Sequence, residues 1–244
     1  MTSKQEVWQP QANGYYATSL FLSQWRPDLQ AGITLKPSGD MQAEEDRKNF
    51  CRRLDFDYRR LAVSHQVHGD QIQVITSDQD IPMTRIGGVD GWVARGATGV
   101  ILGVFGADCP PVFIIHRNQP IAALLHAGWR GVRSGIVTAA GRVLTESFGV
   151  APKDLVAAVG PHIRSCCYEV KEDVTREFPD RWVTRRQEKS YLDLSAGICE
   201  QLQDIGIDKV AVSLDCTYCR SRELYSSWRR KDGSSMMSFV QLLG

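Results

Sequence analysis

Three side chains with metal-binding or nucleophilic chemistry lie at the ends of apolar, strand-like runs. They are His68 in HQVHGD, Cys109 in GADCPPV and His126 in LLHAGWRG. A thiolate and two imidazoles are ligands that zinc prefers, and three protein ligands leave a fourth position for water or substrate. The three residues are far apart in sequence, unlike the closely spaced cysteines of structural zinc motifs. A His/Cys/His metal site is therefore one hypothesis among several.

The same atoms have other uses. Cys109 and His126 could form a nucleophile and base pair, because a neighbouring imidazole lowers the pKa of a thiol. Each residue also has a purely structural interpretation, since cysteine is often buried as a small apolar side chain. Asp108, directly before Cys109, is either an acid that moves protons or a brace for the bend. Sequence alone does not choose between a metal thiolate and a catalytic one.

The chain has seven cysteines, an odd number scattered over 244 residues, which predicts free thiols rather than a disulfide framework. Cys216 and Cys219 form a Cys-x-x-Cys pair in DCTYCRSR, but no second pair of this spacing accompanies it. We interpret that spacing as incidental. The adjacent Cys166 and Cys167 are interpreted as packing residues.

The elements that must position these residues are interleaved strands and helices. Strands are predicted in YYATSLFLSQW, on both sides of HGD, between residues 89 and 126, and in DLVAAVG, KVAVSLDC and MMSFVQLL. Helices are predicted over residues 43–54, from Ser134 as the cap to Phe148, in EDVTREF, and over residues 194–205. This order predicts an α/β (α+β) fold with mixed sheets flanked by helices, in one domain spanning residues 1–244.

Composition excludes some classes of partner. The formal charge of +1 gives no reason to expect nucleic acid or an acidic membrane surface as a partner. No apolar run approaches the ~20 residues of a membrane helix, and no signal peptide is apparent. We therefore expect a cytoplasmic protein. Nothing in the sequence defines the oligomeric state, and a monomer is compatible with it.

A set of ordered motifs resembles the YfiH family, whose members are also called laccase-domain or multicopper polyphenol oxidase-like proteins and purine nucleoside phosphorylases. The motifs, which span about residues 61–230, are HQVHGD, VDGWVAR, GVFGADCPPVFI, AALLHAGWRGVRSGIV, GPHIRSCCYEV, LDLSAGICEQL and DCTYCRSRELYSSWRR. The combination of ADCxPV and HAGWRG is highly specific. The resemblance also implies a fold related to the catalytic domain of the cytotoxic necrotizing factor toxins, a cysteine-dependent deamidase.

The resemblance implies a zinc ion held by His68, Cys109 and His126, with copper as the other metal left open. It implies phosphorolysis of adenosine, inosine and methylthioadenosine, together with deamination of adenosine. Purine nucleosides and phosphate would then be the small-molecule partners. The alternatives are a metal-independent cysteine hydrolase or amidase that uses Cys109 and His126, and a non-catalytic protein in which zinc only fixes the loops.

This chemistry needs acids and an anion site. Asp108, Asp90 and Glu169 are the candidates for proton transfer. Arg130, Arg229 and Arg230 are the expected cations, because a guanidinium fork suits phosphate better than a lysine point charge.

Two elements depart from the family pattern. The Arg-x-Gly-Gly-x-Ser-like stretch expected after the first strand is absent, and Gly233, Ser234 and Ser235 stand near the position of a Gly-Arg pair. Either departure would alter substrate preference if that element contacts nucleoside or phosphate.

Overall fold

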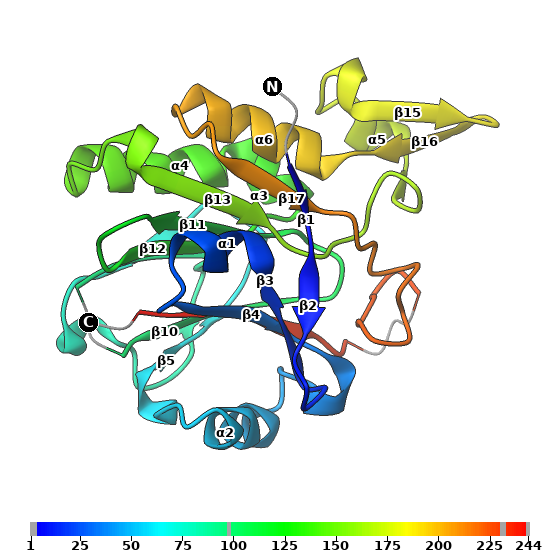
Figure 1. Ribbon diagram of the computed structural model, residues 1–244. Coiled ribbons are helices and arrows are strands. Elements are labelled where there is room, and N and C mark those ends of the chain that lie inside the picture. The colour runs from blue at the N-terminus through cyan, green and yellow to red at the C-terminus, as the bar shows by residue number, and fades with distance from the viewer. Residues whose placement is uncertain (1–3, 97–98, 230–232, 243–244) are drawn as a thin grey trace.

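Two packed β-sheets form the centre of the molecule, and helices cover both outer faces (Figure 1). The computed structural model describes residues 4–96, 99–229 and 233–242. The larger sheet has seven strands in the order β1 (Lys4–Glu6), β17 (Val210–Ser213), β13 (Leu155–Val159), β11 (Pro111–His116), β12 (Ile121–His126), β9 (Gly91–Arg95) and β7 (Ile72–Ile75). The strand pairs at both ends of this sheet are parallel, and those in its middle are antiparallel. The predicted mixed sheet is therefore confirmed.

The second sheet has six strands and also mixes parallel with antiparallel pairs. Its order is β2 (Trp8–Pro10), β3 (Tyr16–Ser19), β4 (Gln30–Thr34), β18 (Met236–Gln241), β10 (Ile101–Gly106) and β5 (Leu61–Ala62). Two small sheets complete the set, one of β14 (Glu169–Val170), β16 (Lys189–Leu192) and β15 (Val183–Arg186), the other of β6 (Ser64–His65) and β8 (Ile86–Gly87).

Helices cover the outer sides of this pair of sheets, but the helix at Leu20–Trp25 packs its buried Phe21 and Leu22 into the core between them. The α-helices are α1 (Leu20–Trp25), α2 (Glu44–Arg53), α3 (Trp129–Ser134), α4 (Ile136–Arg142), α5 (Glu172–Thr175) and α6 (Leu194–Asp204). Single turns of other helix types occur at Lys36–Ser38, Tyr58–Arg60, Asp78–Asp80, Val143–Ser147, Pro152–Asp154 and Asp180–Trp182. Figure 1 shows α3, α4 and α6 over the seven-stranded sheet and α2 under the six-stranded one. None of the helices in the described residues combines the length and apolarity that crossing a bilayer requires.

Side-chain alternation along β11 explains how one strand contributes to two cores. Val112 and Ile114 pack toward the helices, whereas Phe113 and Ile115 pack into the interface between the two sheets. Successive side chains of a strand point to opposite faces, so a strand buried on both sides is apolar throughout. The run PVFII therefore belongs to the central layer of the fold.

Two predicted elements are wrong in detail. The run YYATSLFLSQW is a strand only as far as Ser19, whose Oγ accepts a hydrogen bond from the Leu22 N–H at 3.0 Å and begins α1. A serine cap followed by a buried apolar face outweighs the strand-like composition. Ser134 does not cap a helix either, because α3 begins at Trp129 and Gly135, with φ +85°, separates it from α4.

Candidate metal centre

His68 lies in the turn between β6 and β7, and the buried carboxylate of Asp90 shapes that turn. The carboxylate accepts backbone N–H groups from Val67 at 3.0 Å, His68 at 2.9 Å and Gly69 at 2.8 Å. His68 itself adopts φ +61°, in the left-handed region that is uncommon for non-glycine residues. Three convergent hydrogen bonds offset the cost of that conformation. The HGD turn and the aspartate of VDGWVAR therefore form one unit.

Cys109 lies where the chain passes from one sheet to the other. β10 belongs to the six-stranded sheet and β11 to the seven-stranded sheet, so Asp108 and Cys109 occupy the crossover between them. Pro111 is the first residue of β11, a position that tolerates the missing N–H of proline. The Ala127 N–H donates to the Pro110 carbonyl at 2.9 Å, which ties the crossover to the end of β12.

His126 is the last residue of β12, and Asp90 orients it as well. The distance from Asp90 Oδ1 to His126 Nδ1 is 2.9 Å, and both side chains are buried. This contact keeps the proton on Nδ1 and leaves Nε2 free to act as a ligand. One carboxylate thus positions two of the predicted ligands.

The structure brings His68, Cys109 and His126 together. Their potential ligand atoms all lie within 4.8 Å of one another, and the two imidazole rings are 4.7 Å apart at an angle of 78°. Gly128 packs directly against the group, because a Cβ at this position would lie 3.0 Å from Cys109 Sγ and 3.0 Å from His68 Cδ2. The glycine of HAGWRG therefore makes room for the three side chains.

The electrostatics of the group favour a thiolate. Burial by itself raises the pKa of the Cys109 thiol, but the charge of His126 and hydrogen bonds with both imidazoles outweigh it and lower the pKa from 9.0 to about 6. For His126, burial opposes the charged form, whereas Cys109 and Asp90 raise the pKa to about 9. A thiolate beside an imidazole suits metal ligation and nucleophilic attack alike.

The donor set fits a metal ion. One thiolate and two imidazoles are donors that both zinc and copper accept, and Asp90 supplies the carboxylate–histidine contact that commonly supports a ligating imidazole. Three protein donors match an open site with a position left for another ligand. A cavity of about 290 Å³ adjoins the group, and His68, Cys109 and His126 are among its lining residues.

Asp108 is fully engaged in hydrogen bonds with the segment from residue 217 to residue 228. Oδ1 accepts from the hydroxyls of Thr217 at 2.6 Å and Ser226 at 2.8 Å. Oδ2 accepts from the Ser227 hydroxyl and the Trp228 N–H, each at 2.8 Å. Four donors on one carboxylate favour the bracing interpretation of Asp108 over proton transfer.

Among the described residues, Glu169, Arg130 and Arg229 do not line this cavity. The Glu169 carboxylate pairs with Lys189 at 2.9 Å on the small sheet. Arg130 is exposed, with its guanidinium 4.4 Å from the Trp129 ring, and Arg229 donates to the Tyr218 carbonyl at 3.2 Å. Neither arginine lines the cavity. Arg230 lies outside the described residues.

Sequence reasoning missed Arg85 and Gln66, which both line the cavity. Arg85 is the one arginine or lysine among the described residues that line the cavity, and no motif marks it in IPMTRIGG. Gln66 is part of the HQVHGD motif, so the sequence could have indicated it. Its amide pairs with both backbone groups of Phe105, at 2.6 Å and 2.7 Å, and so joins the His68 loop to β10. Gly233, Ser234 and Ser235, where the sequence departs from the family pattern, also line the cavity.

Comparison with known proteins identifies relatives over most of the chain. The purine nucleoside phosphorylase YlmD of Geobacillus stearothermophilus is 32% identical over 213 residues, which cover 80% of this chain and 77% of that protein. A purine nucleoside phosphorylase of Streptomyces coelicolor is 33% identical and covers 76% of each chain. The crystal structure of YlmD matches with a TM-score of 0.87 at 26% identity, over 98% of this chain and 100% of that one.

The family model described as multi-copper polyphenol oxidoreductase laccase matches residues 36–243, which include all three residues of the candidate centre. Together with the two phosphorylase relatives, this match establishes that the chain belongs to the laccase-like YfiH family.

Proposed function

We propose that this protein is a zinc-dependent purine nucleoside phosphorylase that acts on adenosine, inosine and methylthioadenosine and also deaminates adenosine. The observation that carries the proposal is the convergence of His68, Cys109 and His126 beside a cavity of about 290 Å³. The names of the two relatives supply the reaction class. A zinc ion held by these residues would supply Lewis-acid chemistry and lower the pKa of a coordinated water to near 7.

The protein's own residues hold this centre in place. Asp90 fixes the tautomer of His126 and the backbone of the His68 turn, so neither imidazole needs to reorganise during the reaction. Gln66 fixes the His68 loop against β10, the strand that leads to Cys109. Preorganised donors of this kind lower the cost of reaching a transition state.

Arg85 is the cation that the geometry favours for phosphate. Its guanidinium lies 4.7 Å from the centre of the Phe105 ring, and the Arg47 guanidinium lies 5.6 Å from the same ring. Within the described residues neither arginine forms an ion pair with a carboxylate. Burial and then the charge of Arg47 lower the pKa of Arg85, so an anion here would relieve uncompensated positive charge.

A laccase-type reaction is not supported by the donors. Multicopper sites need clusters of several histidines, and the chain has only five. His116 Nδ1 accepts backbone N–H groups of Asn118 and Gln119, and His162 Nδ1 contacts the Gly160 carbonyl. Among the described residues, the candidate metal clusters contain two histidines, His68 and His126.

The test combines metal content with product analysis. Purified protein is assayed with adenosine with and without phosphate, before and after metal removal and zinc restoration. We expect adenine and ribose 1-phosphate only when zinc and phosphate are both present, and inosine from adenosine without phosphate. Full turnover by stripped protein would contradict the zinc mechanism. A zinc-loaded sample inert toward adenosine, inosine and methylthioadenosine would favour the non-catalytic alternative.

One observation also favours a second candidate function. Cys109, His126 and Asp90 form a thiol–imidazole–carboxylate chain, with the Asp90 contact at 2.9 Å and the pKa of Cys109 lowered to about 6. Such an arrangement serves cysteine hydrolases and amidases without a metal. Stripped protein that cleaves activated amides, and loses this activity when zinc is added, would favour this function.

A further inference from the structure

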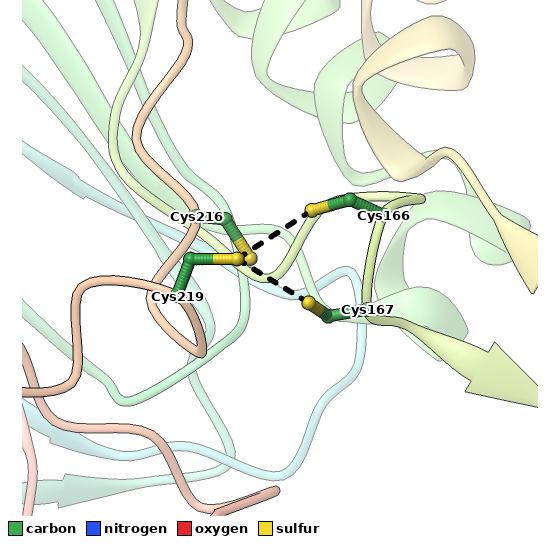
Figure 2. Close-up of side chains that lie close together, drawn as sticks. All are labelled: Cys166, Cys167, Cys216 and Cys219. Carbon is green, nitrogen blue, oxygen red and sulfur yellow. Dashed lines mark hydrogen bonds between the residues drawn. The ribbon is translucent and has the colours of Figure 1, made fainter.

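Four cysteines from two loops converge at a second place in the molecule. Cys166 and Cys167 lie between β13 and β14, and Cys216 and Cys219 follow β17. Figure 2 shows the side chains of the first pair pointing toward those of the second. Their sulfur atoms all lie within 4.8 Å of one another. This convergence contradicts the interpretation of the Cys-x-x-Cys spacing as incidental. The packing interpretation holds for Cys167, which packs partly buried against the core, but not for the exposed Cys166.

The sulfur separations match a tetrahedral metal site. Cys167 Sγ lies 3.4 Å from Cys219 Sγ, and Cys166 Sγ lies 4.0 Å from the same atom. Four thiolates at ~2.3 Å from a central zinc ion would lie about 3.8 Å apart. A disulfide needs sulfurs about 2.05 Å apart and would use only two of the four. The observed separations therefore favour a shared ion over a disulfide.

The backbone around Cys216 is arranged as in a metal-binding loop. The N–H groups of Arg164, Tyr218 and Cys219 hydrogen-bond to the Cys216 sulfur. Cys216 also forms an isolated β-bridge with His162, which holds the second loop beside the one that carries Cys166. Amide donors aimed at a sulfur stabilise the thiolate that a metal requires.

Arginines near both loops would offset the charge of such a site. Arg186 donates to the carbonyls of Ser165 at 2.7 Å and Cys166 at 3.4 Å, and Arg229 donates to the Tyr218 carbonyl. Four thiolates around a divalent cation carry a net charge of about −2, and nearby guanidinium groups reduce the cost of that charge.

We propose that Cys166, Cys167, Cys216 and Cys219 form a structural zinc site, closed by four protein ligands and separate from the His68–Cys109–His126 centre. Its four thiols lose their protons to solvent as the ion binds. With no position left for water, this site has no direct part in catalysis.

The position of the site gives it a role in the fold. Thr217, between the two cysteines of the second loop, donates to Asp108, the neighbour of Cys109. The Asp108 carboxylate also holds Ser226, Ser227 and Trp228. A zinc ion that joins the two cysteine loops would therefore also fix the segment that packs against the candidate active centre.

Metal counting on the whole chain tests the proposal. Protein purified under reducing conditions and loaded with zinc should carry about two ions per chain by native mass spectrometry. Cys219→Ala and His68→Ala should each retain about one, and the double variant none. Cys199→Ala is the matched control, because Cys199 lies on α6 outside both clusters, and it should retain two. We also expect Cys219→Ala, unlike Cys199→Ala, to lower the Tm by several degrees.

X-ray absorption on His68→Ala loaded with zinc gives a second readout, which does not require the four-cysteine site to be disrupted. We expect four sulfur ligands at ~2.3 Å and no nitrogen ligand. A Cys219→Ala variant that binds as much zinc as the wild type, a sulfur count below four in His68→Ala, iron in place of zinc, or an intact mass showing a disulfide in this group would each overturn the proposal. The count of two ions also rests on the proposed zinc at the His68–Cys109–His126 centre, whereas the sulfur count in His68→Ala and the difference between the wild type and Cys219→Ala do not, so failure of the proposed function would leave these two results unchanged.

Discussion

Asp90 is the residue on which the candidate centre depends most, although it does not line the cavity. Its carboxylate holds the turn of His68 and the imidazole of His126, and its pKa is lowered because hydrogen bonds from His126 and the backbone outweigh burial. A buried carboxylate with these partners acts on the reaction through the ligands that it orients. We therefore assign Asp90 to positioning rather than to proton transfer.

Gly128 provides a sharp test of the close packing around the three ligands. Its backbone has φ −62°, which alanine adopts freely, so Gly128→Ala adds only a methyl group 3.0 Å from Cys109 Sγ and His68 Cδ2. We expect zinc affinity at this centre to fall about 10- to 100-fold, measured by competition with a chelator. Gly87→Ala is the control, because a Cβ there has nothing within 4 Å. Equal affinity in both variants would disprove the packing argument.

Arg85 tests the assignment of the phosphate site. Loss of a charge-assisted contact costs about 1.5–3 kcal/mol, so Arg85→Met should raise the KM for phosphate about 10- to 100-fold. The KM for the nucleoside should change much less. Steady-state kinetics with phosphate as the varied substrate measure both constants, with Arg142→Met on the exposed face of α4 as the control. A phosphate KM that stays at the wild-type value would remove Arg85 from the site.

At the scale of elements, each candidate ligand lies at the end of a strand or in the turn between two strands. His68 lies before β7, Cys109 between β10 and β11, and His126 at the end of β12. Strand ends were predictable from the apolar runs and the glycines and prolines that follow them. Which strands become neighbours was not, because β10 and β11 are consecutive in sequence yet belong to different sheets. Arg85 left no local signal, and the two cysteine pairs are visible in the sequence but their convergence depends on such long-range pairing.

His116, at the end of β11, should make stability depend on pH. Its buried Nδ1 accepts two backbone N–H groups at 3.0 Å, and burial lowers its pKa below the ordinary value of 6.5. Since the unfolded chain takes up the proton first, this contribution is present above pH 6.5 and is lost as the pH falls below it. His116→Asn keeps an acceptor that does not titrate.

The measurement is the free energy of urea unfolding at pH 7.5 and pH 5.5. We expect a smaller loss between these two pH values for His116→Asn than for the wild type. His65→Asn, at an exposed histidine, should behave as the wild type does. An identical loss in His116→Asn and the wild type would show that His116 does not titrate in this range.

At the scale of the whole molecule, one buried tryptophan joins the two sheets. Trp92 of β9 has no exposed surface, and its Nε1 donates to the Gly103 carbonyl of β10 at 3.1 Å. Because β9 and β10 belong to different sheets, this contact and the apolar core between the sheets couple the two layers. Helices cover the outer faces of the two sheets (Figure 1).

Trp92→Phe should therefore destabilise the whole fold. Loss of the hydrogen bond and of the buried ring volume should cost about 2–4 kcal/mol in the free energy of unfolding. Chemical denaturation followed by circular dichroism measures this cost. The control Trp228→Phe, at a half-exposed tryptophan, should cost about 0.5 kcal/mol or less. Equal effects of the two variants would show that the Trp92 contact does not couple the sheets.

The sequence predicted the class of fold and the convergence of His68, Cys109 and His126 better than the surroundings of the candidate centre. Apolar periodicity is a local property, and the His68, Cys109 and His126 motifs are specific in combination. Arg130 was expected at the site as a guanidinium for phosphate and Glu169 as an acid; in the structure the Arg130 guanidinium lies 4.4 Å from the Trp129 ring and the Glu169 carboxylate pairs with Lys189. Side-chain direction at the end of an element depends on tertiary contacts that sequence spacing does not encode.

The crossover that carries Cys109 cannot change in length, whereas the cavity-lining residues outside the strands can be exchanged. Only residues 107–110 connect β10 to β11, so an insertion there would displace a sheet as well as a ligand. Ser227 and Gly233–Ser235 form a part of the cavity wall that lies outside any strand. Replacing that wall with the equivalent segment of a relative is therefore the direct route to a new substrate range, with the metal ligands left as they are.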